Sequence, residues 1–462
     1  MRTCRLRFWH GPARMLLAAW LLAVLAGGCS RPVVVPAAPA PPAAARPPAT
    51  FPLHVEAGRR YLVDAAGQPF LLQGESAWGL ITRLTREQAE FYLEDRRRRG
   101  FNTVLAQLVA HHRGIGAPTN AYGEDPFQVA GDFGTPNERY FAHADWVIRK
   151  AAEKGMLVLL TPAYTGYLGD GREGWMPMMR DNGASKLREY GRYVGRRYAG
   201  YKNIVWVDGG DYSPTPSDRE LVRAVAEGIR DAEPDALQTF HGGRGTAALA
   251  YWGAAEPWLR VDSIYTDENG VVDAARRARQ RSTLPFFLIE ARYERHPAGN
   301  EQIVRRQVFQ VLLSGGAGHV SGLEGLWEFS PPWHDYLDNA GARAVARVHA
   351  LFDGRPWWTL EPDLAGRRLV RGACVAGDHA VAALSADHRF GLVYVPAERS
   401  ITVDFSALAG ASVRARWIDP ASGESYLVDA PAGGEPTQRR LRPPGANRSG
   451  YSDWLLWFES AR

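Results

Sequence analysis

The feature that most constrains the fold is a regular alternation of short apolar runs with amphipathic helical segments. The runs are rich in β-branched and aromatic residues and lie at residues 70–78, 103–109, 157–161, 203–208, 237–241, 263–266, 285–290 and 319–323. Short, mainly apolar runs of this kind are typical of strands buried in a parallel sheet. Eight strand-then-helix units therefore predict a (β/α)8 TIM barrel, which we assign to residues 53–358.

Local signals support the barrel over a doubly wound sheet. No dinucleotide-binding fingerprint follows the first run. The connections after the predicted strands are long and aromatic, as expected if one face of the barrel is functional. Residues 85–88 have capping-box spacing, and residues 135–138 combine a capping box with a proline at the first helical position, so both predict helix starts.

The character of the chain changes after residue 358. Apolar β-type runs at residues 380–384, 390–395, 412–418 and 454–458 alternate with turns rich in Gly, Pro and Asp. This pattern predicts a small antiparallel β-sandwich domain over residues 359–462. Such a domain either binds carbohydrate or only packs on the barrel, and the sequence leaves both alternatives open.

The N-terminal segment predicts export and lipid attachment. A basic stretch and a short apolar run precede the small residues Ala26, Gly27 and Gly28 and then Cys29. The apolar run is too short to span a membrane, so residues 1–28 are interpreted as a lipoprotein signal peptide. We expect Cys29 to be lipidated, and Ser30 after it is compatible with the outer membrane, on its periplasmic or cell-surface face. The Pro/Ala-rich residues 29–52 are interpreted as a linker.

Composition excludes several function classes. The formal net charge is +5, but the first 28 residues hold four arginines and no acidic residue, so the remainder is nearly neutral. This gives no basis for nucleic-acid binding. Cys374 is the only cysteine besides Cys4 and Cys29, and no spaced Cys/His pattern suggests a metal site, so we predict no metal or other cofactor. We expect a monomer.

Two carboxylates end predicted strands and are the candidate catalytic pair. Asp211 follows the apolar run at residues 203–208 and a Gly-Gly pair, and Glu290 ends the run at residues 285–290. Two carboxyl groups are the minimum equipment for hydrolysing a glycosidic bond. Their placement on the fourth and seventh predicted strands is shared with many retaining barrel glycosidases. The Gly-Gly pair would let a ligand approach the backbone closely. Asp208, three residues before Asp211, is expected to point to the opposite face.

Aromatic and polar residues after other strands are candidates for binding sugars. Aromatic rings receive the C–H faces of sugars, and imidazole or carboxylate groups hydrogen-bond their hydroxyls. The candidate substrate-binding residues are Glu75, Trp78, His111, His112, Tyr164, Trp175, His241, Tyr265, Glu294 and Trp327.

Several of these segments carry a family resemblance. Residues 74–78 (GESAW), 84–102 (LTREQAEFYLEDRRRRGFN), 136–148 (PNERYFAHADWVI), 206–211, 239–241, 290–294 and 315–327 resemble, in order, the apiosidase-like glycoside hydrolase family. The resemblance implies a (β/α)8 catalytic domain followed by a small β domain, with Asp211 as acid/base and Glu290 as its partner carboxylate. Glu75 stands where the family usually has Asp, and Asp208 stands at a usually apolar position.

These observations predict a glycoside hydrolase acting on a plant-type glycan, such as a pectic, apiose-containing one, by a two-carboxylate, retaining mechanism. Two alternatives stay open. The same fold could act on another β-glycan, such as a glucan or mannan, because barrels host many specificities. The chain could also be a non-catalytic glycan-binding surface lipoprotein.

The lipidation of Cys29 can be tested directly. Replacing Cys29→Ser removes the only sulfur at the predicted processing site, so the protein should become soluble or stay unprocessed. Membrane fractionation measures this. A variant that fractionates like the wild type would contradict the interpretation of residues 1–28 as a lipoprotein signal.

Overall fold

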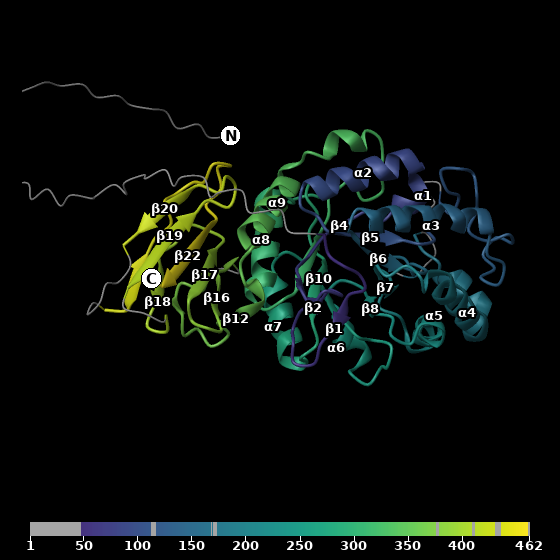
Figure 1. Cartoon of the computed structure of the whole chain (residues 1–462), viewed down its shortest axis with the longest axis horizontal. Helices are drawn as coiled ribbons and strands as arrows, with labels where there is room; N and C mark the ends of the chain where they lie inside the picture. Colours follow the sequence, from purple (N-terminus) through teal and green to yellow (C-terminus); the bar gives the residue numbers. More distant parts are fainter. Residues whose placement is uncertain are drawn as a thin grey trace, which may run out of the picture. The chain divides into compact units, whose positions relative to one another are not determined.

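The computed structural model describes residues 48–111, 117–167, 169, 173–375, 378–408, 412–429 and 436–460 (Figure 1). Cys29, the signal segment, most of the predicted linker and His112 lie outside these residues. Within the described ranges, no helix combines the length and apolar composition needed to cross a bilayer.

Parallel strands form a nearly closed eight-stranded barrel, which confirms the predicted fold. The order around the barrel is β8-β7-β6-β5-β4-β11-β10-β9, so the first and last barrel strands, β4 and β11, lie side by side. The strands are β4 Leu72–Ser76, β5 Thr103–Gln107, β6 Leu157–Thr161, β7 Ile204–Gly209, β8 Gln238–His241, β9 Asp262–Tyr265, β10 Phe286–Glu290 and β11 Gly318–Ser321. The remaining seam, between β8 and β9, is held by backbone amides of Arg260 and Val261, which donate to the carbonyl of Gln238.

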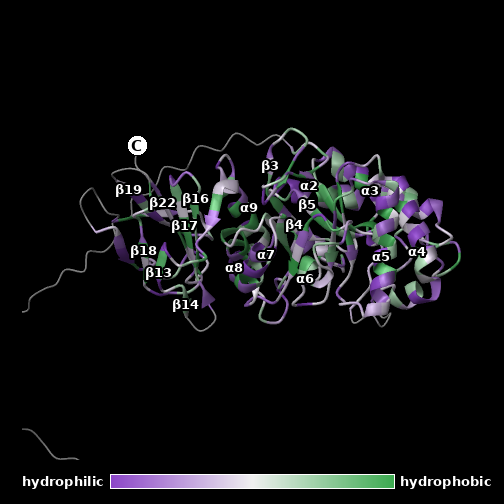
Figure 2. Cartoon of the chain, turned by 90° about the horizontal axis from the view of Figure 1, so that it is seen from below, coloured by the Kyte–Doolittle hydropathy of each residue, from purple (hydrophilic) through white to green (hydrophobic). Residues whose placement is uncertain are grey.

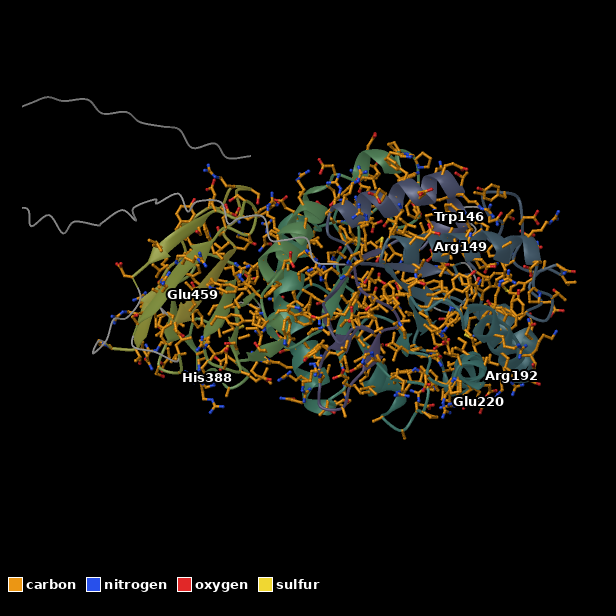
Figure 3. All side chains as sticks on the ribbon, viewed as in Figure 1. Trp146, Arg149, Arg192, Glu220, His388 and Glu459 are labelled. Carbon is orange, nitrogen blue, oxygen red and sulfur yellow. The ribbon has the colours of Figure 1, made fainter. Side chains whose placement is uncertain are left out.

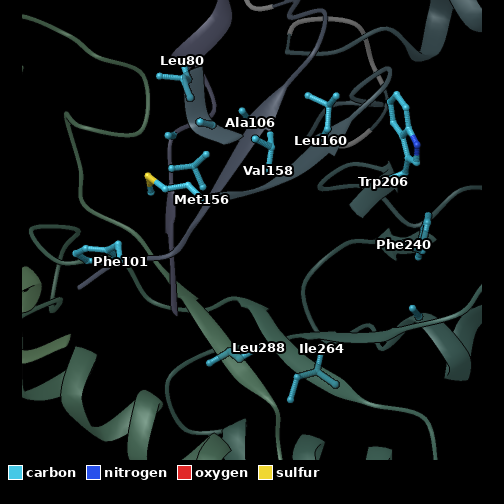
Figure 4. Packing of buried hydrophobic residues seen from close by; sticks show 14 of the residues in the cluster. Leu80, Phe101, Ala106, Met156, Val158, Leu160, Trp206, Phe240, Ile264 and Leu288 are labelled. Atoms are coloured by element: carbon cyan, nitrogen blue, oxygen red, sulfur yellow. The ribbon is translucent and has the colours of Figure 1, made fainter. Parts of the chain in front are cut away.

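Strand alternation divides the apolar side chains between two cores. Leu105, Leu159 and Val207 point into the barrel, whereas their neighbours pack outward against the helices. Figure 4 shows part of the outer layer, which includes Val158, Leu160, Trp206, Phe240, Ile264 and Leu288. Burial of each such side chain contributes roughly 1.5–3 kcal/mol to stability. Because both sides are buried, the strands read as continuous apolar runs.

A small antiparallel sheet closes one end of the barrel interior. It consists of β1 His54–Val55, β2 Leu62–Val63 and β3 Pro69–Phe70. Strands β2 and β3 pair antiparallel, with Leu62 opposite Phe70 and Val63 opposite Pro69. Leu53, Leu62 and Phe70 join the apolar cluster inside the barrel, so this sheet covers the end opposite the long loops.

Helices surround the barrel. They are α1 Leu80–Arg83, α2 Arg86–Arg98, α3 Glu138–Glu153, α4 Met176–Tyr198, α5 Pro216–Ala232, α6 Ala248–Trp252, α7 Val271–Arg281, α8 Glu301–Leu313 and α9 Ala340–Phe352, with 3-10 turns η2 Trp333–Tyr336 and η3 Trp357–Thr359. In Figure 2 the helices α3, α4 and α5 carry both hydrophobic and hydrophilic residues, as expected for helices with one face on the barrel. Figure 3 shows polar side chains on their outer faces, among them Arg149, Arg192 and Glu220.

One predicted helix start is confirmed and one is wrong. Thr85 and Gln88 form the predicted capping box at the start of α2. Helix α3 begins two residues later than predicted, at Glu138, with Asn137 as its N-cap. Thr135 donates its hydroxyl proton to the carbonyl of Asp132 instead, and so belongs to the preceding turn.

The C-terminal region forms antiparallel sheets that pack together as a sandwich. A six-stranded sheet has the order β12-β16-β17-β22-β19-β20, and a three-stranded sheet has the order β13-β18-β21. The strands are β12 Leu360–Pro362, β13 Leu369–Arg371, β14 Cys374–Val375, β15 Asp378–His379, β16 Val381–Ser385, β17 Phe390–Val395, β18 Ile401–Asp404, β19 Val413–Ile418, β20 Ser425–Val428, β21 Gln438–Leu441 and β22 Trp454–Ser460. Strands β14 and β15 form a separate hairpin.

The six-stranded sheet is buried on both faces at its centre. Val393 and Leu456 belong to the core shared with the three-stranded sheet, whereas Leu392 and Tyr394 belong to the core shared with the barrel helices. Phe309 of α8 stacks on Tyr394 with ring centroids 4.9 Å apart. Of the two roles considered for this domain, packing on the barrel is therefore observed.

Candidate active site

A cleft of about 420 Å³ lies over the carboxyl ends of the barrel strands. Each of the eight strands, or the loop that follows it, contributes to its wall. In strand order the contributors include Trp78, Gln107, Tyr164, Asp211, Arg244, Tyr265, Glu290 and Trp327. This is the face on which barrel enzymes carry their active sites.

A β-bulge directs Glu290 into the cleft. Leu288 is in register with the outward-facing Ile264, but Glu290 is in register with the inward-facing Tyr265, so Ile289 is an extra residue in β10. Strict alternation would have given Glu290 the outward orientation of Leu288. The bulge instead turns the side chain of Glu290 toward the cleft, and bulges often redirect side chains in this way beside active sites.

The two glycines before Asp211 serve packing within the chain. Gly209 has φ +91°, and a Cβ there would lie 2.4 Å from the carbonyl oxygen of His241. A Cβ on Gly210 would lie 2.8 Å from the backbone nitrogen of Thr165 and 2.9 Å from the ring of Tyr164. The expectation that these glycines leave room for a ligand is therefore wrong, because the chain's own neighbouring loops occupy that space.

Glu290 is held by a buried histidine. Nε2 of His241 lies 2.8 Å from Oε2 of Glu290, and the His241 side chain is fully buried while that of Glu290 is 14% exposed. Burial by itself would lower the pKa of His241, but the hydrogen bond and charge of Glu290 outweigh it and raise the pKa. The pair therefore favours an imidazolium that donates to a carboxylate.

Asp211 is in a different electrostatic environment. Burial, reinforced by the negative charge of Glu290, raises the pKa of Asp211 to about 6, against the lowering effect of His241, Arg244 and Tyr265. The hydroxyl of Tyr265 donates to Oδ2 of Asp211 over 3.5 Å. Asp211 thus keeps its proton at a pH at which an ordinary aspartic acid has lost it, as a general acid requires.

Asp208 points away from this cleft, as expected from alternation. It is buried on the outer side of β7, 1% exposed, and burial raises its pKa well above the ordinary value. A neutral carboxylic acid is the form compatible with such surroundings.

Five predicted substrate-binding residues lie at or beside the cleft. Trp78, Tyr164, Tyr265 and Trp327 line it, and His241 lies behind Glu290. The rings of Trp78 and Tyr164 are 5.3 Å apart, and Trp78 donates its indole proton to the hydroxyl of Tyr293. Trp78 and Tyr265 are nearly buried, whereas Trp327 is half-buried, so Trp327 offers the more open ring.

Trp175 is a correction to the predicted sugar platform. Its ring is 1% exposed and packs between Phe127 and Phe133, and its indole proton goes to the carbonyl of Val109. The residue therefore belongs to the core. His111 packs on the same ring and does not line the cleft.

Two predicted sugar-binding carboxylates are structural. Glu75 faces outward from β4, where it accepts from Arg96 at 2.9 and 3.0 Å and from the hydroxyl of Tyr92. Glu294 accepts the amide proton of Gly341 in the first turn of α9, a position where a negative charge is favourable. Neither lines the cleft.

The sequence predictions missed part of the wall. The loop after β6 contributes Tyr167, which is 49% exposed, and Glu173. The segment after Glu290 contributes Ala291, Arg292, Tyr293 and His296. The other missed residues are Gln107 and Arg244. Gln107, a polar residue ending an apolar strand, could have been found by its position. Arg244 and Arg292 could not, because their loops carry no local signal. The described residues contain no group of three His, Cys, Asp or Glu side chains that could hold a metal ion.

Comparison with known proteins agrees with this geometry. The model of the apiosidase-like catalytic domain matches residues 56–359, and a model of a collagen-binding domain, described from a collagenase, matches residues 366–459. No curated protein matches the chain by sequence.

Solved structures share the fold. A glycoside hydrolase structure, 22% identical, has a TM-score of 0.76 over 89% of this chain and 97% of its own. A family 5 glycoside hydrolase from Bacteroides vulgatus, also 22% identical, has a TM-score of 0.75 over 89% of this chain and 94% of its own. With the family model spanning the whole barrel, the chain belongs to the apiosidase-like family and is a glycosidase.

Proposed function

We propose that this glycosidase hydrolyses an acidic, pectin-type glycan by a retaining double displacement, with Asp211 as acid/base and Glu290 as nucleophile. The observation that carries the mechanism is the contrast between the two carboxyl groups. Asp211 has its pKa raised to about 6, whereas Glu290 is hydrogen-bonded to a histidine whose pKa is raised. One group is suited to donate a proton and the other to act as an anion.

In the first step, a carboxylate oxygen of Glu290 bonds to the anomeric carbon while the bond from that carbon to the leaving oxygen breaks. The proton of Asp211 passes to the leaving oxygen. In the second step, Asp211 takes a proton from water, whose oxygen attacks the anomeric carbon and releases Glu290.

The same electrostatics supports the change in role of Asp211 between the steps. The negative charge of Glu290 helps to raise the pKa of Asp211. Forming the ester removes that charge, so the pKa of Asp211 falls and the residue becomes a carboxylate able to accept a proton. His241 keeps the free Glu290 oriented through its 2.8 Å hydrogen bond.

The substrate proposal rests on Arg244. Its guanidinium projects into the cleft and contacts the ring and, at 3.4 Å, the hydroxyl of Tyr265, and no ion pair to it is present among the described residues. An arginine in a cleft can bind a substrate carboxylate in bidentate fashion. A neutral glucan or mannan, the alternative substrates, has no carboxylate for this cation to bind.

We further propose that the enzyme is anchored to the outer membrane through lipidated Cys29. The support is the sequence of the signal segment and of the linker that would hold the catalytic domain away from the lipid surface.

The mechanism predicts different effects for the two carboxylates. Glu290→Ala should abolish turnover on every substrate, because no covalent intermediate can form. Asp211→Ala should spare substrates with good leaving groups, which depart without protonation, and added azide should partly restore its rate by replacing water in the second step. NMR of the first-formed product should show retained anomeric configuration; inversion would exclude Glu290 as the nucleophile.

The pH dependence provides an internal control. Asp211 must be protonated in the first step, so kcat/KM should fall as pH rises through about 6. The charge of Arg244 lowers the pKa of Asp211, so Arg244→Met should move this alkaline limb to higher pH. An unmoved limb would mean that another group supplies the proton.

Charge recognition by Arg244 can be tested with matched substrates. Purified protein lacking the first 47 residues should release product from de-esterified pectic fractions faster than from the same fractions with methyl-esterified carboxylates. Arg244→Met should remove this preference, with a loss of about 10-fold in kcat/KM on the acidic substrate, because about 1.4 kcal/mol of binding is lost. Hydrolysis of neutral β-glucan or mannan in preference to pectic fractions would overturn the substrate proposal.

Trp327 and Trp175, both predicted from the sequence to bind sugar, should respond differently to replacement. Trp327→Ala should raise KM about 10-fold with the melting temperature nearly unchanged, because the ring is half-buried at the cleft. Trp175→Ala should instead destabilise the protein by about 3–5 kcal/mol, because it empties a core site. Thermal unfolding and kinetics together measure both. A large loss of stability in Trp327→Ala would place that ring in the core as well.

A further inference from the structure

Helix α8 lies between the C-terminal domain and two loops of the cleft. Successive residues of an α-helix point about 100° apart, so three adjacent side chains can reach three different surroundings. Arg305 reaches Asp453 of the sandwich, Arg306 reaches the β14–β15 hairpin and the loop after β9, and Gln307 reaches the segment after Glu290. The helix therefore contacts both the added domain and the active-site wall.

Arg306 joins the hairpin to the loop after β9. One guanidinium nitrogen donates to Oδ1 of Asp378 at 3.0 Å, and the other donates to the carbonyl of Glu268 at 3.1 Å and to Oδ1 of Asn269 at 3.2 Å. The arginine is 8% exposed, whereas the side chain of Asp378 remains partly open to water. Next to it, Gln310 donates to the carbonyl of His379 in the same hairpin.

The loop after β9 is in turn connected to the cleft wall. Its first residue, Thr266, donates its amide proton to the carbonyl of Glu290, and Asp267 lines the cleft. The carboxylate of Glu268 pairs with Arg292, also in the wall, at 3.0 Å.

Gln307 fixes the other side of this connection. Its side-chain oxygen accepts the amide proton of Arg292 at 2.7 Å, and its amide donates to the carbonyl of Arg292 at 3.0 Å. Both segments that flank Glu290 are thus held by adjacent residues of one helix.

We propose that the C-terminal domain braces the active site, and that Asp378 and Arg306 are positioning residues that hold the loop after β9 and, through Glu268, Arg292. This inference rests on the proposed catalytic role of the cleft. It assigns the domain a function that requires no ligand of its own. Removal of Asp378 leaves Arg306 free to turn away, so Glu268 and Arg292 lose their fixed positions while the barrel core stays intact.

A second ion pair between the domain and the barrel provides a matched control. Glu361 of β12 pairs with Arg279 near the end of α7, away from the cleft, and its side chain is exposed as that of Asp378 partly is. Both pairs link the same two parts of the chain, but the described contacts of Glu361 include none with the loops flanking Glu290. Asp453 is unsuitable as a control because it is completely buried and its loss would damage the domain interface.

The experiment compares Asp378→Ala, Arg306→Met, the double variant and Glu361→Ala in the full chain. Hydrogen exchange should accelerate at residues 266–270 in the first three variants and stay at the wild-type level in Glu361→Ala. On whichever glycoside the wild type hydrolyses, kcat/KM should fall about 10-fold in Asp378→Ala and Arg306→Met, with the melting temperature little changed. The double variant should be no worse than Arg306→Met, because Asp378 acts through that arginine.

The outcomes separate this proposal from the proposed function. Unchanged exchange at residues 266–270, additive losses in the double variant, or an equal loss in Glu361→Ala would each overturn the brace. If pectic fractions prove inert, or if Asp211→Ala and Glu290→Ala leave activity intact, the proposed function fails, whereas the exchange measurement still decides the brace. Rescue of kcat/KM by Asp378→Glu, which restores the charge, would support it.

Discussion

The whole arrangement depends on strand alternation in a closed parallel sheet. Alternate residues of each strand face the barrel interior or the surrounding helices, and the carboxyl ends of all strands meet at one face. The site departs from this rule where its carboxylates are placed. The bulge at Ile289 turns Glu290 inward, and the positive φ of Gly209 turns the chain before Asp211. Regular strand alternation therefore forms the cleft, and two local irregularities place the carboxyl groups of Glu290 and Asp211 in it.

The raised pKa of Asp211 makes the stability of the protein depend on pH. Asp211 has a folded-state pKa of about 6, above the unfolded value of about 3.9. Its contribution to stability is therefore fully present below about pH 4 and is lost as pH rises through about 6. The hydrogen bond from His241 to Glu290 partly offsets the cost of placing two acids in one cleft. Destabilised, pKa-shifted groups of this kind are characteristic of functional sites.

The C-terminal domain is integrated with the barrel. The buried ion pair between Arg305 and Asp453 and the stacking of Phe309 on Tyr394 connect α8 to the sandwich, and the hydroxyl of Tyr394 donates to the same Asp453. Breaking a buried pair on one side leaves an uncompensated charge, typically costing about 3–5 kcal/mol, so such a contact fixes one relative placement of the elements it joins. An element held in this way can transmit position to the loops that contact it.

The barrel, the sandwich and the presence of two carboxyl groups at the cleft, Asp211 and Glu290, could be predicted from local sequence patterns. Periodicity, caps and turn residues are local, so the runs at residues 157–161 and 285–290 and the helix start at Thr85 could be read directly. Asp211 closely follows an apolar strand and Glu290 ends one, so both could be picked out from the sequence. Long-range packing determines where the other predicted and unpredicted site residues lie. Trp175 and Glu75 carry the same local signals as Trp327 and Glu290, yet folding buries the first against Phe127 and Phe133 and pairs the second with Arg96. Arg244 and Arg292 reach the cleft only because separate loops converge there. Contacts between side chains far apart in the sequence depend on how the sheet closes into a barrel, and no local sequence pattern contains that information.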